Sequence, residues 1–401
     1  MVYLEKFLDH MLTDQKLRSG NTVSQEQLNL LQEFNSYLVG KNISLSTRNN
    51  YVGTLRLISK AIGKPLDKDI TKKDIERWLK SISEDCFVTK LGKIITIKKY
   101  FKWLYYRGTN KMKKKGVFPP VVDFIEMPSN KVEKRLTSAD LLTQEEVNRL
   151  VNACNNTRDK AIVSLLFDSG LRRGELTNLN IGDIHITITE QYLTVRNEQG
   201  NKTGARDVPL NYSISSLKDW LNVHPFKDQQ DKPLFVCIEH GDGNQKHRYG
   251  KRLEGQTVLR IIKQATKDAG INKRVYVHLF RHSRNTDLED KGAPRSARIF
   301  MFGWSPKSNM PEHYSHLSKE QNVDKIRIAD GLKPQPQLVD LLKPILCPRC
   351  SEQNSPTNKY CGKCAMPLDK EAMQEMKMFN VLKKMIVKYP EVKAIAQEVA
   401  D

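Results

Sequence analysis

The helical periodicity of this chain is interrupted between residues 119 and 139, and that break limits the fold more than any other feature. Pro119, Pro120 and Pro128 stand there, together with the charged stretch 130–135. Proline lacks the backbone N–H that continues a helix or a sheet, so it ends regular structure. With 401 residues, the chain is also too long for one ordinary domain. The sequence therefore predicts at least two domains joined by a linker.

The segment before the break has the pattern of a small helical bundle. Apolar residues over 28–38 recur at helical spacing. Ser46 has the side chain of an N-cap for a second helix, and Thr71 with Asp74 has the pattern of a capping box for a third. A fourth helix is expected over residues 91–105. Together the four predict an all-helical domain.

The net charge limits the choice of partner. Lys and Arg number 66 against 46 Asp and Glu, which gives a formal charge of +20. Because like charges repel within a folded chain, an excess of this size favours a polyanionic partner, whose condensed counterions the cationic side chains displace. We interpret the chain as a nucleic-acid-binding protein, while plain solubility is the alternative that charge alone leaves open.

The fourth predicted helix begins a basic stretch. Residues 98–116 hold eight Lys or Arg and no acid, with aromatic residues interleaved. One interpretation is a helix whose apolar face packs inward while its basic face meets phosphates. The other is a lysine-rich face that meets only solvent. The sequence does not decide between them.

The sequence has no mark of a secreted or membrane protein. Residues 1–6 lack a basic stretch followed by a long apolar core, and no run approaches the roughly 18 apolar residues of a membrane span. Of seven cysteines, four cluster near the C-terminus, which fits a reducing compartment with one metal site better than a disulfide framework. A cytoplasmic protein without a membrane partner is expected.

The longer second segment contains both helix and strand patterns. Thr143 precedes a helix with acids in its first turn, and residues 161–167 are apolar enough for a buried helix. Two strand patterns, residues 192–196 and 206–210, flank a glycine-containing turn and predict a β-hairpin. Further helices are expected over residues 257–269, after Leu279 and over residues 295–302. The predicted fold class is mainly α with a small β-sheet.

Five short motifs with chemically active side chains follow one another in this segment. Arg172 comes just after a Gly turn, from which its planar fork can reach a phosphate, and Glu175 lies three residues later to support it. His278 and Arg281 share one face if they begin a helix. The other three motifs contain Lys202 in the predicted hairpin turn, Trp304 after a glycine, and Tyr314 in a His-Tyr-Ser-His run. Each pattern is weak alone, because most such residues are structural or solvated.

In this order and at these intervals, the motifs resemble the tyrosine recombinase, or phage integrase, family. The resemblance covers roughly residues 22–330, and residues 303–311 look most like archaeal integrases. The matching pieces are Gly170–Glu175, Lys202–Gly204, His278–His282, Phe302–Trp304 and His313–His316. The resemblance implies the following order of segments: an N-terminal extension (1–21), a helical core-binding, SAM-like domain (22–118), a linker (119–139), a catalytic domain (140–335) and a C-terminal ribbon with a helical tail (336–401).

The resemblance implies a role for each motif residue. Arg172 and Arg281 would clamp the scissile phosphate, His278 would bind a phosphate oxygen and assist proton transfer, Lys202 would protonate the leaving 5′-hydroxyl, Trp304 stands where many relatives have His, and Tyr314 would be the nucleophile. No metal or nucleotide is expected at this site. The partner would be a double-stranded recombination site, with four copies of the chain on two DNA sites. We expect Tyr314 to act in its own subunit, although its delivery to a neighbour stays open.

These roles imply a site-specific recombinase that integrates or excises a mobile element. A Xer-like resolvase of chromosome dimers and a type IB topoisomerase share the chemistry, and a non-enzymatic DNA-binding regulator could use the same fold. The sequence names neither the DNA site nor the direction of the reaction.

Two CxxC pairs near the C-terminus predict a metal site. Cys347 with Cys350 and Cys361 with Cys364 form pairs that are ten residues apart. Four thiolates suit tetrahedral Zn²⁺, and a segment too small for its own core needs such a tie to fold. The segment resembles a zinc ribbon, so structural Zn²⁺ is the one cofactor expected. Residues 371–388 then have the pattern of an amphipathic helix, which either packs against the ribbon or contacts another subunit.

Overall fold

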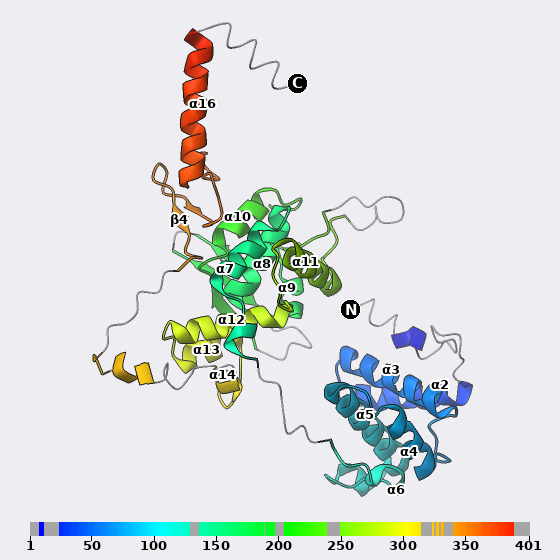
Figure 1. Ribbon diagram of the computed structural model, residues 1–401. Coiled ribbons are helices and arrows are strands. Elements are labelled where there is room, and N and C mark those ends of the chain that lie inside the picture. The colour runs from blue at the N-terminus through cyan, green and yellow to red at the C-terminus, as the bar shows by residue number, and fades with distance from the viewer. Residues whose placement is uncertain are drawn as a thin grey trace. The chain divides into compact units, whose positions relative to one another are not determined.

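The structure is a computed structural model that describes residues 8–11, 24–128, 136–187, 189–196, 204–238, 249–313, 323–324, 326–328, 330–332 and 340–388. The chain divides into two compact units between Lys134 and Arg135, inside the predicted break (Figure 1). Both units are mainly helical, and the second contains small antiparallel sheets, which confirms the predicted fold class.

Four long helices form the first unit: α2 (Gln25–Gly40), α3 (Leu45–Ile62), α4 (Lys72–Ser81) and α5 (Phe87–Tyr106). Their ends follow the expected side chains with one difference. Thr71 and Asp74 form the predicted capping box of α4. The N-cap of α3 is Ser44 rather than Ser46, because the Ser44 hydroxyl is the one that accepts from the Thr47 N–H.

The basic stretch 98–116 contributes to both the core and the surface of this unit. Tyr100 and Trp103 are buried, and their ring centroids lie 5.2 and 5.1 Å from that of Phe34. Lys98 is also buried. By contrast, the lysines at 113–115 are exposed. The choice between a phosphate-facing and a solvated surface therefore concerns only the cations outside the core.

The first residues of the predicted linker form a short helix that packs on the first unit. After a 3₁₀ turn, η1 (Asn110–Lys113), the chain forms the short helix α6 (Pro120–Asp123), which contacts α4 and α5. Val121 and Val122 are buried there. The Lys98 Nζ donates to the Ile125 carbonyl at 2.7 Å and so fastens this helix to α5. Proline suits the first position of a helix, because the N–H it lacks would have no partner there.

The second unit surrounds one buried helix. It contains α7 (Gln144–Asn152), α8 (Thr157–Ser169), α9 (Arg173–Asn178), α10 (Ile214–Asn222), α11 (Gly255–Asp268), α12 (Val277–Asp290), α13 (Arg295–Phe302) and α14 (Met310–His313), with 3₁₀ turns η2 (Ser138–Asp140) and η3 (Ile181–Asp183). Residues 161–169 of α8 are all buried, which includes the apolar run predicted over residues 161–167, and α8 contacts α7, α10 and α12. Thr143 caps α7 as expected.

A three-stranded antiparallel sheet lies beside these helices. Its strands are β1 (Ile184–Ile186), β2 (Gln191–Val195) and β3 (Arg206–Pro209), in that order. The pairing of β2 with β3, with Val195 opposite Arg206, confirms the predicted hairpin, whose turn lies outside the described residues. The sequence did not predict β1, which is three half-buried residues long.

Asp168, at the end of α8, joins three segments of the second unit. Its fully buried carboxylate accepts from the backbone N–H groups of Asn211, Tyr212 and Ser213 at 2.8–2.9 Å. Arg284 of α12 lies 3.7 Å from the same carboxylate. A buried charge is tolerated when it is hydrogen-bonded and paired in this way. The turn before α10 and the middle of α12 are therefore both held to α8.

The cysteine-rich segment docks on the second unit. It contains the two-stranded sheet of β4 (Ile345–Leu346) and β5 (Gln353–Asn354), and β5 contacts α10 (Figure 1). Lys218 of α10 lies 2.7 Å from Glu352, and the Tyr212 hydroxyl donates to Asp340 at 2.7 Å. Leu342 is buried in the core of the unit. The ribbon is therefore anchored to the second unit by both polar and apolar contacts.

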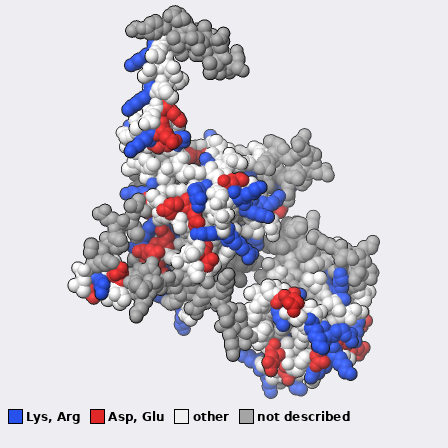
Figure 2. Space-filling model, viewed as in Figure 1, with Lys and Arg blue, Asp and Glu red and all other residues white. Residues whose placement is uncertain are grey.

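The last described helix, α16 (Lys370–Lys388), packs against the ribbon only at its start. Ala372 is fully buried, and the Tyr360 hydroxyl donates to Glu375 at 3.0 Å. Beyond these turns Met378, Phe379 and Leu382 are exposed. Figure 2 shows acidic side chains near the base of this helix and basic ones along its edge. Among the described residues, no helix has the length and apolar character to cross a membrane.

Candidate active site and metal centre

Gly170 begins the site because it turns the chain out of α8. Its φ is +59°, in the left-handed region that suits glycine, and its N–H donates to the Leu166 carbonyl. A Cβ at this position would lie 2.4 Å from Cε1 of Phe302, so the ring of Phe302 packs directly on the glycine. This turn places Arg172 as the N-cap residue of α9.

Arg172 is held by its own helix and by a second arginine. Its backbone N–H donates to Glu175 at 2.8 Å and its side chain donates to the same carboxylate at 3.2 Å, which confirms the support expected from Glu175. Arg206 of β3 donates to both oxygens of Glu175, at 3.2 and 3.1 Å. The Arg172 side chain remains 28% exposed, whereas Glu175 and Arg206 are buried. The Arg172 side chain is therefore partly accessible to solvent.

Arg281 connects the Gly170 turn to the end of α13. It is 1% exposed, and it donates to the Gly170 carbonyl at 2.9 Å and to the Phe302 carbonyl. Its guanidinium carbon lies 4.8 Å from the ring centroid of Phe302 and 5.2 Å from that of Trp304. Carbonyl and π contacts on both sides fix a positive charge at this point.

His278 lies near both motif arginines. It is the second residue of α12, with Arg281 one turn later, as the spacing predicted. Burial lowers its pKa below the ordinary value, and the charges of Arg281 and Arg172 lower it further. The imidazole is therefore neutral at neutral pH and can accept a proton. The charges of both arginines reach the His278 ring, and Arg281 also donates to the Gly170 carbonyl, two residues before Arg172. Arg172, His278 and Arg281 therefore occupy one region of the second unit.

Trp304 completes the described part of the site. Gly303 ends α13 in the left-handed region, with φ +61°, and turns the next residue back toward the helix. The Trp304 ring is buried, and its centroid lies 4.9 Å from that of Phe302. Its contact with the Arg281 guanidinium places the fourth motif beside the first and the third.

Two predicted site residues, Lys202 and Tyr314, lie outside the described residues. The described chain resumes at residue 204 before β3, and it ends at His313 before the tyrosine. The sequence named Gly170 and Phe302 only as members of the matching motifs, and it gave Arg206 no role in the site. The alternation of β3 held a clue to Arg206, because this charged residue stands on the same buried face as Val208.

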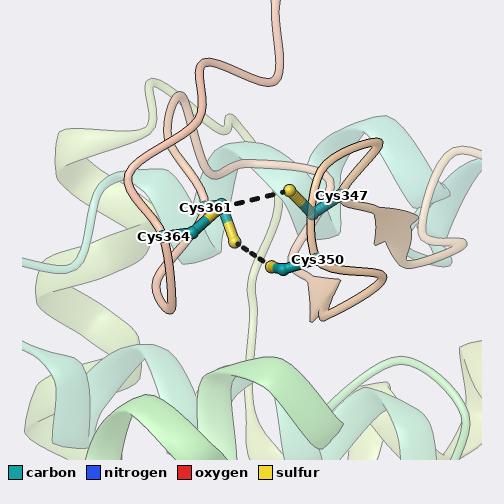
Figure 3. A group of neighbouring side chains, drawn as sticks. All are labelled: Cys347, Cys350, Cys361 and Cys364. Carbon is teal, nitrogen blue, oxygen red and sulfur yellow. Dashed lines mark hydrogen bonds between the residues drawn. The ribbon is translucent and has the colours of Figure 1, made fainter.

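The four C-terminal cysteines converge in space. All four sulfur atoms lie within 4.8 Å of one another, with Cys347 3.5 Å from Cys364 and Cys350 3.6 Å from Cys361 (Figure 3). Four thiolates around a tetrahedral Zn²⁺ would lie about 3.8 Å apart, from a Zn–S distance of about 2.3 Å. The cluster therefore has the ligand type and spacing of a metal site.

The ionisation of these thiols also suits a cation. Burial opposes ionisation of Cys361, but the N–H groups of Cys364 and Lys363 outweigh it and lower the pKa to about 6. The Glu352 N–H favours the Cys350 thiolate, yet burial and the neighbouring thiols raise its pKa to about 12. Four thiolates this close repel one another, and a divalent cation removes that conflict.

Comparison with known proteins adds independent findings. The family model for the phage integrase family matches residues 140–321, and that for its N-terminal SAM-like domain matches residues 31–108. A tyrosine recombinase of Thermosipho africanus is 27% identical over 74% of this chain and 98% of its own length. Transposase A from transposon Tn554 of Staphylococcus aureus is 25% identical over 79% of this chain and 87% of its own. A lambda integrase dimer bound to a core site matches with a TM-score of 0.53 and 17% identity, over 73% of this chain and 77% of that one.

Proposed function

The chain belongs to the phage integrase family of tyrosine recombinases and is a site-specific DNA recombinase, and we propose that it cuts DNA through a covalent link to Tyr314. The phenolic oxygen of Tyr314 attacks the scissile phosphorus, the bond to the 5′-oxygen breaks, and a 3′-phosphotyrosine link forms. The 5′-hydroxyl of a second strand then attacks this link, releases the tyrosine and reseals the DNA. The link conserves the bond energy, so the reaction requires no ATP.

Arg172 and Arg281 form the proposed phosphate clamp. Attack on a phosphodiester builds negative charge on the oxygens that are not in the chain, and fixed cations lower that barrier. The partly exposed Arg172 side chain would meet these oxygens directly, since Glu175 already orients it. Arg281 is a buried, immobile charge that lowers the pKa of His278. Because contacts within the chain hold both arginines, little reorganisation accompanies the reaction.

His278, Lys202 and Trp304 supply the remaining groups of the proposed site. A phenol with a pKa of about 10 is a poor nucleophile at neutral pH, so it needs a base or a strong positive field. The neutral imidazole of His278 can take that proton and bind a phosphate oxygen. Lys202 is assigned to protonate the leaving 5′-oxygen. The indole N–H of Trp304 is a donor that can reach a phosphate oxygen but carries no proton between groups.

One observation carries this proposal. Arg281 binds the carbonyls of Gly170 and Phe302 and contacts the Trp304 ring, which brings the first, third and fourth motifs of the sequence into one place. These motifs are separated by about 130 residues of chain, from Gly170 to Trp304. Nothing in the local sequence requires their meeting, whereas a phosphate-binding site does.

The test uses a nicked suicide substrate, on which the cut strand diffuses away and the covalent complex accumulates. The wild-type chain should form a denaturation-resistant protein–DNA adduct, and Tyr314→Phe should form none. Tyr249→Phe, which alters an exposed tyrosine of the same unit, is the matched control and should form the adduct normally. Adduct formation by Tyr314→Phe would remove this tyrosine from the nucleophile role.

We further propose that the chain serves a mobile element in the cytoplasm, with four copies on two DNA sites. The similarity to a transposase of Tn554 supports the mobile element, and the likeness of residues 303–311 to archaeal integrases supports an archaeal host. The first unit and residues 140–335 would act as the core-binding and catalytic domains. Direct repeats at the ends of the flanking DNA would support integration, whereas a chromosomal dimer-resolution site would favour a Xer-like role.

Zn²⁺ is the proposed metal of the four-cysteine cluster. Its support is the convergence of four sulfur atoms at spacings close to those of a tetrahedral thiolate site. Cys347 and Cys350 would hold it from the turn between β4 and β5, and Cys361 and Cys364 from the turn before α16. The metal would supply structure alone, by tying together a segment that has too few apolar residues for a core.

A further inference from the structure

We propose that Arg206 is a positioning residue of the catalytic centre, which holds Arg172 and the Trp304 turn in one fixed arrangement. The inference rests on the proposed function, which assigns Arg172 and Trp304 to the scissile phosphate. Arg206 would not touch DNA; it would act through Glu175 and through the end of α13.

The first contact of Arg206 is with the carboxylate that orients Arg172. Glu175 accepts hydrogen bonds from the guanidinium of Arg206 and from the backbone and side chain of Arg172. Its side chain is 2% exposed and that of Arg206 is 4% exposed, so water does not compete for these bonds. A bidentate guanidinium fixes the plane of a carboxylate. Arg206 therefore sets the direction in which Glu175 holds Arg172.

The second contact of Arg206 is with the end of α13. Its Nε donates to the Met301 carbonyl at 2.9 Å, while Arg281 donates to the next carbonyl, that of Phe302. The last carbonyls of a helix have no partner within it, and they attract cations. Two arginines thus cap the end of α13, directly before the turn that presents Trp304. Arg206 is the residue that contacts both this end and Glu175.

The position of Arg206 in the chain adds a third link. It is the first residue of β3, paired with Val195, and it lies four residues after Lys202. Arg206 therefore fixes the start of β3 against Glu175 and the end of α13. One side chain thereby relates the start of β3 to Arg172 and to the turn before Trp304.

A buried arginine can also be purely structural, and the chain offers a matched example. Arg158 of α8 is buried to a similar degree, and it donates to the Val236 carbonyl at 3.0 Å and to Asp159. Neither partner belongs to the proposed site. Arg158→Met therefore removes a buried guanidinium of the same unit without touching the contacts of Arg172.

The experiment compares Arg206→Met, Arg206→Lys and Arg158→Met in the full chain. The rate of adduct formation in a single turnover is measured on two nicked substrates, one with an ordinary scissile phosphate and one with a neutral methylphosphonate. On the ordinary substrate Arg206→Met should be about 100-fold slower, the effect of misplacing a catalytic group by about 1 Å. DNA affinity should be unchanged. The deficit should shrink on the neutral substrate, because it has less negative charge for Arg172 to stabilise.

Arg206→Lys keeps the charge but cannot bind Glu175 and Met301 together, so it should give an intermediate rate with the same dependence on substrate. Arg158→Met should show no such dependence. If Arg206→Met slows both substrates equally, or if Arg206→Lys behaves like Arg158→Met, Arg206 is merely structural and the inference is wrong. If Arg206→Met does not fold, the rates of Arg206→Lys on the two substrates decide whether Arg206 is a positioning residue. A wild-type chain that forms no Tyr314-dependent adduct would refute the proposed function as well.

A double-mutant cycle gives a second readout. If Arg206 acts through Glu175, then Arg206→Met combined with Glu175→Gln should be little slower than the slower single variant. Multiplicative losses would mean that the two residues act independently, and they would contradict the proposed path through the carboxylate.

Discussion

Gly170→Ala should destabilise the second unit and displace Arg281, because it adds a methyl group where two constraints already meet. A left-handed conformation costs a residue with a Cβ about 1–2 kcal/mol. The new Cβ would also lie 2.4 Å from the Phe302 ring, and overpacking a core costs about 1–3 kcal/mol. The midpoint of the sum is about 3.5 kcal/mol, or about 7–14 °C in the Tm of a unit of this size.

Calorimetric unfolding of the full chain is the assay, since the transition of the first unit provides an internal standard. Gly174→Ala is the matched control: Gly174 lies within α9, and no atom is within 4 Å of its added Cβ. That substitution should leave stability unchanged or raise it by up to about 1 kcal/mol, because alanine suits a helix better than glycine. The reasoning is refuted if Gly170→Ala melts within 1 °C (about a tenth of the expected shift) of the wild-type chain, or if the two variants shift alike.

Three further predictions concern the chemistry. Lys202→Ala should slow cleavage of ordinary DNA but have little effect when sulfur replaces the leaving 5′-oxygen; equal slowing would remove Lys202 from the acid role. Because the pKa of His278 is lowered, the wild-type rate should persist as pH falls through 6.5, the ordinary value, and decline only below it. This decline at low pH should be absent from the pH–rate profile of His278→Gln. A decline in the wild-type profile that is centred at or above pH 6.5 would contradict the role of His278 as the base. Removal of the proposed Zn²⁺ by a chelator should unfold residues 345–368, which the NMR spectrum of the chain would show. Formation of the protein–DNA adduct should remain intact.

The lowered pKa of His278 also affects stability. As pH falls below the ordinary value, the unfolded chain binds a proton at this histidine before the folded chain does. The contribution of His278 to stability is therefore fully present above that value and is lost as pH falls through the lowered pKa of the folded state.

Features with a local cause could be predicted from the sequence. The Thr71 capping box, the start of α7 after Thr143 and the shared face of His278 and Arg281 each depend on residues within one helical turn. The pairing of β2 with β3 followed from alternation around a turn. The N-cap of α3 was predicted at Ser46, whereas the Ser44 hydroxyl is the one that accepts from the Thr47 N–H.

Features built from distant contacts could not be predicted. Arg206 meets Glu175 across 31 residues, and Arg281 meets Gly170 across 111. A pattern in a single sequence does not indicate which distant residues will be in contact. The prolines gave no sign that residues 120–123 form a helix that packs on α4 and α5, because the Lys98 contact beside this helix comes from α5. The order of the motifs indicated a shared site, but the structure was needed to identify the residues that hold it together.

The docking of residues 340–342 has a topological consequence. Asp340 binds Tyr212 and Lys291, and α14 joins the same unit just before Tyr314. The chain that contains the proposed nucleophile is therefore attached to the second unit on both sides, through α14 before Tyr314 and through Asp340 after it. If one copy supplied this tyrosine to a neighbouring copy, one of these two attachments would have to break. Loss of the Asp340 carboxylate is the smallest change that would weaken the second attachment.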